Sequence, residues 1–126
     1  MSVDAGNIRD ARDEALMAVT PIDGRYRART RALENYFSEF ALIRYRARVE
    51  IEWYLELGAN PAIDAIGSIT PDAARLLRAI HDDFTLADAR RVKQLEAETN
   101  HDVKALEYFL KEKIGALRLG LPLEMI

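Results

Sequence analysis

Four arginines alternate in one short stretch of the sequence, at positions 25, 27, 29 and 31, with no acidic residue between them. In an extended segment their side chains would lie on one face and bind phosphate or carboxylate, the anions that match the guanidinium fork. In a helix the same side chains would be distributed around the surface and hydrated. Because Arg25 stands between a glycine and Tyr26 after a turn sequence, an anion site is one interpretation, and a charged surface is the other.

A second polar cluster, Asn100-His101-Asp102, stands at the start of a predicted helix. Free backbone N–H groups and the helix dipole favour anions there, and histidine can exchange a proton near neutral pH. The simpler alternative is that Asn100 and Asp102 cap the helix while His101 faces solvent. The other histidine, His81, precedes two aspartates and is interpreted as a surface residue. The spacing of the two histidines does not fit a metal site, so neither a metal nor a cofactor is expected.

The apolar residues recur at helical spacing, which predicts an all-α fold with four main helices. The first is a long amphipathic helix from about 31 to 57, which Gly58 and Pro61 end. Its apolar stripe includes Tyr36 and Phe37, and we interpret Trp53 as a core residue.

Two further helices have clear start signals. Thr70 precedes a proline, the residue type favoured at the first helical position, and predicts a helix over 71–82. Thr85 can cap a third helix, over roughly 86–97, which has a regular apolar face.

The last predicted helix begins at Thr99 and Asp102, which stand in capping-box spacing, and it ends at Gly115. Residues 117–126 follow, and they are unusually apolar for a terminus. No β-hairpin pattern and no internal repeat occurs.

Composition limits the class of protein. The chain has 126 residues, the size of one domain, with a net charge of −3 and no cysteine. Disulfide scaffolds, thiolate zinc sites and cysteine nucleophiles are therefore excluded. There is no motif for binding nucleic acid, no apolar run long enough to span a membrane and no secretory signal at the start. We expect a soluble, cytoplasmic protein that binds neither nucleic acid nor membrane.

Two segments resemble a known family. Thr20-Pro21-Ile22-Asp23-Gly24-Arg25-Tyr26 is similar to the Ser/Thr-Pro-x-Asp-Gly-Arg-Tyr motif near the start of adenylosuccinate lyases. Residues 98–113 resemble the Thr-Asn-His-Asp-Val-Lys-Ala-x-Glu-Tyr-Phe-Leu-Lys block of their bacterial branch. Residues 37–39 and 49–53 fall where that branch has similar residues, so the resemblance covers about 15–115.

The resemblance implies a fold, a domain organisation and an activity. The family belongs to the fumarase/aspartase superfamily of homotetramers, whose subunits meet around a central helical bundle. On this basis residues 1–19 are a flexible arm, 20–116 are the N-terminal helical domain, and 117–126 begin the link to a central domain. Members eliminate fumarate from adenylosuccinate, giving AMP, and from the succinylated carboxamide ribotide of purine synthesis.

Site residues carry over position by position from the two motifs. The resemblance implies that Arg25, Tyr26, Asn100, His101 and Asp102 bind the nucleotide substrate. His101 is the residue expected to touch substrate and assist the electrostatics, and Thr99 is left as a cap. The reaction is a β-elimination, in which a base removes a proton beside a carboxylate and an acid protonates the departing nitrogen.

Three family segments are absent from the 126 residues. They are Phe-x-His-Phe-Ala-Cys-Thr-Ser, the Thr-His-Gly-Gln segment of the general acid, and the Ser-Ser-x-Met-Pro-x-Lys-x-Asn-Pro loop of the base. We therefore expect the N-terminal portion of a lyase, as a fragment or a truncated gene product, which is inactive alone. The alternatives are a helical interaction module derived from a lyase domain, pairing through its apolar tail, and another member of the same superfamily.

Overall fold

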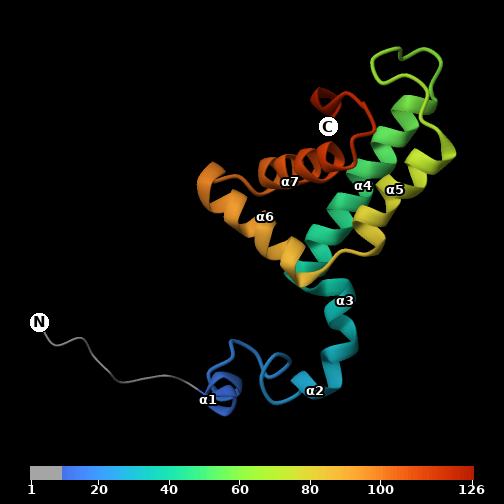
Figure 1. Cartoon of the computed structure of the whole chain (residues 1–126). Helices are drawn as coiled ribbons and strands as arrows, with labels where there is room; N and C mark the ends of the chain where they lie inside the picture. The colour runs from blue at the N-terminus through green and yellow to red at the C-terminus, as the bar shows by residue number, and fades with distance from the viewer. Residues whose placement is uncertain (1–9) are drawn as a thin grey trace, which may run out of the picture. The chain divides into compact units, whose positions relative to one another are not determined.

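The computed structural model describes residues 10–126, and within them it contains helices and no strand, so the all-α prediction is confirmed (Figure 1). The first nine residues of the predicted arm lie outside the described part. In chain order the elements are α1 (Ala11–Leu16), α2 (Arg27–Thr30), the 3-10 turn η1 (Arg31–Leu33), α3 (Glu34–Phe37), α4 (Glu39–Ala59), α5 (Pro71–Asp82), α6 (Leu86–Thr99), α7 (Asp102–Ala116) and the 3-10 turn η2 (Leu123–Met125).

The chain divides into two compact units, a first that ends at Ser38 and a second that spans Glu39–Ile126. The four helices of twelve or more residues, α4 to α7, all belong to the second unit. None of the helices within 10–126 is both long enough and apolar enough to cross a bilayer.

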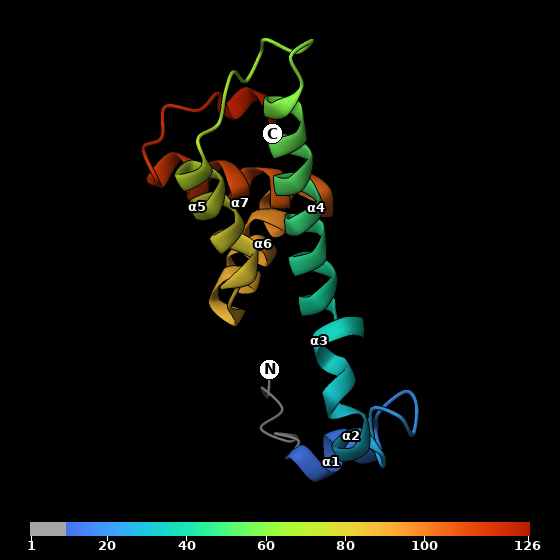
Figure 2. The ribbon, with the colours of Figure 1, turned by 90° about the vertical axis from the view of Figure 1, so that its right-hand side faces the viewer.

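The second unit is built from two pairs of helices that are consecutive in the chain. Helices α4 and α5 are antiparallel neighbours joined by a loop, and α6 packs against α7 (Figures 1 and 2). Helix α4 also contacts α6 and α7, which joins the two pairs around one core.

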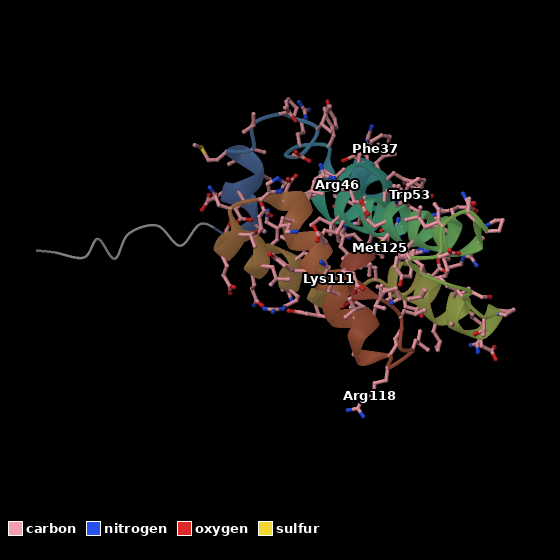
Figure 3. The ribbon with its side chains drawn as sticks, turned by 90° about the horizontal axis from the view of Figure 1, so that it is seen from above. Phe37, Arg46, Trp53, Lys111, Arg118 and Met125 are labelled. Carbon is pink, nitrogen blue, oxygen red and sulfur yellow. The ribbon has the colours of Figure 1, made fainter. Side chains whose placement is uncertain are left out.

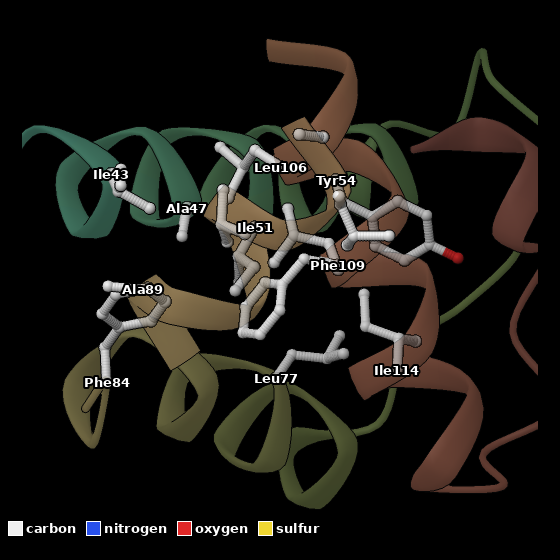
Figure 4. Close-up of a cluster of buried hydrophobic side chains, with 14 of the residues drawn as sticks. Ile43, Ala47, Ile51, Tyr54, Leu77, Phe84, Ala89, Leu106, Phe109 and Ile114 are labelled. Carbon is white, nitrogen blue, oxygen red and sulfur yellow. The ribbon is translucent and has the colours of Figure 1, made fainter. Parts of the chain in front are cut away.

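The core of this unit is a single cluster of apolar side chains from all four helices (Figure 4). Its members include Ile51 and Tyr54 of α4, Leu77 of α5, and Phe109 and Leu110 of α7, each no more than 2% exposed. Burial of one such aliphatic or aromatic side chain contributes about 1.5–3 kcal/mol relative to leaving it in water. This cluster is therefore the main source of stability in the second unit.

The C-terminal residues 117–126 return to this core. Leu117, Leu123 and Ile126 are half-buried against it, and the Tyr54 hydroxyl donates a hydrogen bond of 3.0 Å to the carbonyl of Pro122. The apolar character of the tail is thus explained by packing within its own unit.

The predicted helix over 31–57 is not continuous, which corrects the sequence interpretation. Ser38 has an extended backbone, with φ −75° and ψ 165°, and separates α3 from α4. Its hydroxyl donates a hydrogen bond to the carbonyl of Glu34, an example of how serine competes with the helical hydrogen-bond pattern. Tyr36 and Phe37 lie before this break, and they are 60% and 83% exposed.

The helix starts at Thr70 and Thr85 are confirmed. The Thr70 hydroxyl accepts from the backbone N–H of Ala73 at 3.2 Å. Thr85 forms a full capping box with Asp88, in which each side chain accepts a hydrogen bond from the other's backbone N–H. These two caps place α5 and α6 as the sequence predicts.

The predicted capping box of Thr99 and Asp102 is wrong. Thr99 is the last residue of α6, and His101 caps α7 instead. Helix α7 also continues to Ala116, past the Gly115 expected to end it.

Two burial predictions are wrong as well. Trp53, labelled in Figure 3, is 59% exposed on α4, because its neighbours Ile51, Tyr54 and Leu55 occupy the face that packs on the core. The sequence predicts His81 at the surface, but it is only 6% exposed, because it lies on the face of α5 that turns toward α4.

Candidate functional site

The motif over 20–26 folds as a turn in the first unit. The Gly24 N–H donates to the carbonyl of Thr20 at 3.1 Å, and the Tyr26 N–H donates to the carbonyl of Pro21 at 2.8 Å. The Thr30 hydroxyl donates to the carbonyl of Ile22 at 3.3 Å, which holds α2 against this turn. The turn thereby presents Arg25 and Tyr26 as consecutive exposed side chains.

The two predicted site residues of this unit interact with each other. The Arg25 guanidinium lies 5.5 Å from the centre of the Tyr26 ring, and Arg29 lies 6.0 Å from the same ring. Such cation–π contacts orient the guanidinium without using its hydrogen-bond donors. Within residues 10–126 no carboxylate forms an ion pair with Arg25, so its donors are available to an anionic ligand.

A pocket of about 720 Å³ lies beside this turn, and Arg25 and Tyr26 line it. Thr20 and Pro21 of the motif form another part of its wall, and α1 contributes Arg12 and Leu16. Sequence reasoning missed Arg12, because an arginine in a short polar arm of mixed charge gives no signal of its position.

The second set of predicted site residues lies at the junction of α6 and α7 in the second unit. Asn100 ends α6 in the left-handed conformation, with φ 51° and ψ 34°, and its N–H donates to the carbonyl of Glu96 at 2.7 Å. Asparagine tolerates this conformation better than most residues. The sharp turn at Asn100 brings His101 to the start of α7.

His101 caps α7 through one ring nitrogen and leaves the other exposed. Its Nδ1 accepts a hydrogen bond from the Lys104 N–H at 3.2 Å. In the neutral ring the proton must then be on Nε2, which makes Nε2 a donor. The side chain is 63% exposed, so this donor can reach a ligand. The N-cap of α7 is thus His101 itself, whereas the simpler sequence interpretation gave the cap to Asn100 and Asp102.

Asp102 is fixed by two hydrogen bonds. Its Oδ2 lies 2.6 Å from Nη1 of Arg46 on α4, and its Oδ1 accepts from the Val103 N–H at 2.8 Å. The Arg46 hydrogen bond, followed by the one from Val103, holds the pKa of Asp102 below its usual value. The carboxylate is therefore ionised near neutral pH and ties the start of α7 to α4. No local pattern could have identified Arg46, which lies 56 residues away in the sequence.

The part of the chain that the structure describes contains no group of three residues suited to hold a metal ion.

The other histidine, His81, lies with its Nδ1 3.1 Å from Asp82 and its Nε2 3.7 Å from Glu52. Glu52 also accepts two hydrogen bonds from Arg78. This cluster connects α4 to α5.

Comparison with known proteins gives a consistent result. No family model matches the chain. The adenylosuccinate lyase of Vibrio cholerae is 50% identical over 103 residues, which are 82% of this chain and 23% of that enzyme. The adenylosuccinate lyase of Legionella pneumophila strain Corby is 48% identical over 79% of this chain and 22% of its own length, and that of Escherichia coli K12 is 46% identical over 82% of this chain and 23% of its own.

These matches agree with both motifs, and they involve only the first part of each relative. The chain spans less than a quarter of the length of the curated relatives it matches. By sequence, the chain therefore corresponds to the N-terminal portion of adenylosuccinate lyases.

Proposed function

We propose that this chain supplies substrate-binding residues to an adenylosuccinate lyase. The whole enzyme would eliminate fumarate from adenylosuccinate and from the succinylated carboxamide ribotide of purine biosynthesis, as a cytoplasmic homotetramer of the fumarase/aspartase superfamily. The observation that carries the proposal is the identity of 50% over 82% of the chain with an adenylosuccinate lyase. The exposed guanidinium of Arg25 and the exposed ring of His101 support it.

The proposed roles follow from the available atoms. Arg25 has guanidinium N–H groups that no carboxylate of residues 10–126 occupies, and Tyr26 beside it offers a ring and a hydroxyl. They would hold an anionic group of the nucleotide. His101 would donate from Nε2 to an oxygen on which negative charge increases during the elimination, which is the assisting role assigned to it.

Asn100 and Asp102 would act mainly by placing that histidine. The left-handed Asn100 sets the direction in which the chain enters α7. Asp102 fixes the first residue of α7 through Arg46, and its lowered pKa makes it a poor base near neutral pH.

The 126 residues by themselves are proposed to be inactive. The segments that carry the general acid and the serine base in the family do not occur in this sequence. Adenylosuccinate added to the purified chain should therefore show no change in purine absorbance above the uncatalysed rate.

A chimeric enzyme tests the proposed role directly. Residues of this chain would replace the matching portion of the E. coli K12 enzyme, and fumarate release would be measured. We expect activity in the chimera, and a loss of at least about 100-fold in kcat/KM for Arg25→Ala, the size of effect seen when one charge-stabilising donor is removed.

The histidine requires a pair of variants, because it is also a cap. His101→Asn keeps a side chain that caps helices well but removes the Nε2 donor, whereas His101→Ala removes both. We expect both variants to lose activity and only His101→Ala to lose stability. Arg90→Ala, a change on the exposed surface of α6, is the control. Near-normal kinetics for Arg25→Ala and His101→Asn would refute the assignment.

The alternative function is a helical interaction module derived from a lyase domain. The tail packs on its own core, but α4 carries a separate exposed apolar series, Leu42, Val49 and Trp53, which favours this alternative. Self-association through that face predicts a dimer by light scattering that Trp53→Lys converts to a monomer. A wild-type chain that stays monomeric would exclude it.

A further inference from the structure

Helix α1 and the motif turn meet in the first unit through a buried glycine. Gly24 is the only buried residue between 20 and 26. A Cβ at this position would clash with the carbonyl oxygen of Ala15 and would lie 3.2 Å from the Cβ of Ala18. The absence of a side chain therefore lets α1 and the residues after it lie directly against the turn.

This contact places α1 as one wall of the pocket described above. The helix is fixed at its start by Asp10, whose carboxylate accepts from the N–H groups of Arg12 at 2.7 Å and Asp13 at 3.0 Å. Arg12 and Leu16, four residues apart, lie on the same side of the helix, and both line the pocket. Arg25 and Tyr26 of the motif turn line the same pocket.

The two arginines of the pocket, Arg12 and Arg25, both lack a carboxylate partner within residues 10–126. Two such guanidinium groups around one pocket favour a doubly charged oxyanion, and arginine binds phosphate through parallel hydrogen bonds. Other arginines of the stretch differ: Arg27 lies 4.0 Å from Glu34, and Arg31 is not among the lining residues.

The rest of the wall is mostly apolar. Ala15, Leu16, Ala18 and Pro21 offer aliphatic surface, and the ring of Tyr26 offers an aromatic one. A volume of about 720 Å³ lies within the range of small-molecule sites. The ligand that suits such a pocket combines a phosphate monoester with a flat, weakly polar ring system, which is the chemistry of a nucleoside monophosphate.

We propose that Arg12 is a second phosphate-binding residue, which α1 adds to the motif residues Arg25 and Tyr26 in this pocket. The proposal rests on the proposed function for the role of Arg25, and it extends the site to an element that precedes the motif. Besides its place in the motif turn, Gly24 allows α1 to approach closely enough for Arg12 to bind the phosphate.

The test is a titration of the full 126-residue chain followed by ¹H–¹⁵N NMR, with AMP, adenosine and inorganic phosphate as separate probes. We expect AMP to shift the amide signals of residues 12–26 and to bind more tightly than either adenosine or phosphate. Arg12→Ala and Arg25→Ala should each weaken AMP binding by about 10- to 100-fold, as expected for a lost charge-assisted contact. Arg31→Ala, an arginine of the same stretch outside the pocket, should bind AMP as the wild type does.

Gly24→Ala provides a second, independent variant. It leaves every charged side chain in place but should displace α1, so its loss of AMP affinity should match that of Arg12→Ala. Unchanged amide signals from α2, in the same unit but away from the Gly24 contact, would show that the rest of the first unit remains folded.

Several outcomes would overturn the proposal. They are an AMP affinity of Arg12→Ala equal to that of Arg31→Ala, adenosine binding as tightly as AMP, and no shift of residues 12–26 at millimolar AMP. The chimera separates the two claims. If the chimera is active and sensitive to Arg25→Ala but AMP binding is unchanged by Arg12→Ala, the role of Arg12 is refuted and the proposed function stands. If AMP binding depends on Arg12 but the chimera is inactive, the role of Arg12 stands and the proposed function is refuted.

Discussion

Asp102, which we propose as a site residue, also joins two helices of the second unit. It accepts hydrogen bonds from Arg46 of α4 and from the N–H of Val103 in its own helix. Both bonds favour the ionised form, so protonation of Asp102 costs more in the folded chain than in the unfolded chain. The link between α4 and α7 is therefore strongest above the pH at which an unfolded aspartate titrates.

This asymmetry gives a prediction for acid stability. A carboxyl whose pKa is lowered by folding stabilises the folded state above its unfolded pKa, near 3.8, and loses that contribution as the pH falls through the folded pKa. Asp102→Asn should lower the urea midpoint at pH 6 and reduce the loss of stability between pH 6 and pH 3. Asp64→Asn, in the exposed loop before α5, should change neither quantity. An acid response identical to that of the wild type would contradict the role of the Arg46 contact.

His101 has two ring nitrogens, and the structure shows which of them is used for capping. The sequence could show that a histidine stood at a helix start, and the motif implied a contact with substrate. Only the backbone geometry shows that Nδ1 is already used by the Lys104 N–H. The chemistry assigned to His101 must therefore come from Nε2, which the proposed His101→Asn variant removes.

At the scale of helices, capping decides which threonine matters. Thr85 closes a reciprocal capping box with Asp88, whereas Thr99 ends its helix and donates only to the carbonyl of His101 at 3.2 Å. Asp88 is further held by Lys113 of α7 at 2.6 Å. Burial by itself would raise the pKa of Asp88, but the hydrogen bonds from Lys113 and Thr85 lower it overall.

Thr85→Ala should therefore reduce the free energy of unfolding by about 1 kcal/mol, the usual cost of losing an N-cap. Thr99→Ala, the threonine that the sequence pattern favours as a cap, should cost less than half as much. Urea unfolding followed by circular dichroism measures both. Equal losses would mean that the capping box at Thr85 contributes nothing beyond ordinary threonine packing.

The sequence predicts helices well here where the signal is local, and it fails where the partner is distant. Thr70 and Thr85 are predictable as caps because a cap depends on residues within one turn. Ser38 interrupts a pattern that otherwise reads as continuous helix, and a hydroxyl bond to the carbonyl of Glu34 leaves no periodic trace. Trp53 is exposed despite its apolar character because the stripe of apolar residues on α4 is wider than the face that the other helices cover.

The candidate site follows the same rule. Arg25, Tyr26 and the segment 100–102 stand in contiguous motifs, so the sequence alone is enough to predict them as site residues. Arg46 and Arg12 come near those motifs only in the folded chain. Arg46 of α4 bonds to Asp102 of α7, and Arg12 lines the pocket because α1 packs against Gly24. Neither lies at a spacing that a pattern could detect.

For the whole chain, the division into two units raises the question of whether one unit can fold without the other. Every member of the buried core cluster lies in the second unit, which spans Glu39–Ile126. A unit with its own core can fold alone. We therefore expect the chain 39–126 to be helical and to unfold cooperatively at the same urea midpoint as the full chain.

Phe109→Ala in both chains is the reference for this comparison. Phe109 is 1% exposed, and replacement of a buried phenylalanine by alanine costs about 3–5 kcal/mol. An equal loss in both chains would show that the same core is measured. A chain 39–126 that is unfolded, or that melts without cooperativity, would show that the second unit depends on the first.

The pairing of consecutive helices has a consequence for synthesis on the ribosome. Helices α4 and α5 can pack together as soon as residue 82 has left the ribosome. Phe109 and Leu110 of α7, which complete the same core, are synthesised later. Until then the inner faces of Ile51 and Leu77 lack the aromatic and aliphatic partners that cover them in the finished fold. The nascent chain thus carries an exposed apolar surface for the time needed to add about 30 residues, a few seconds at ordinary elongation rates, and this interval is its period of greatest exposure to aggregation and to chaperone binding.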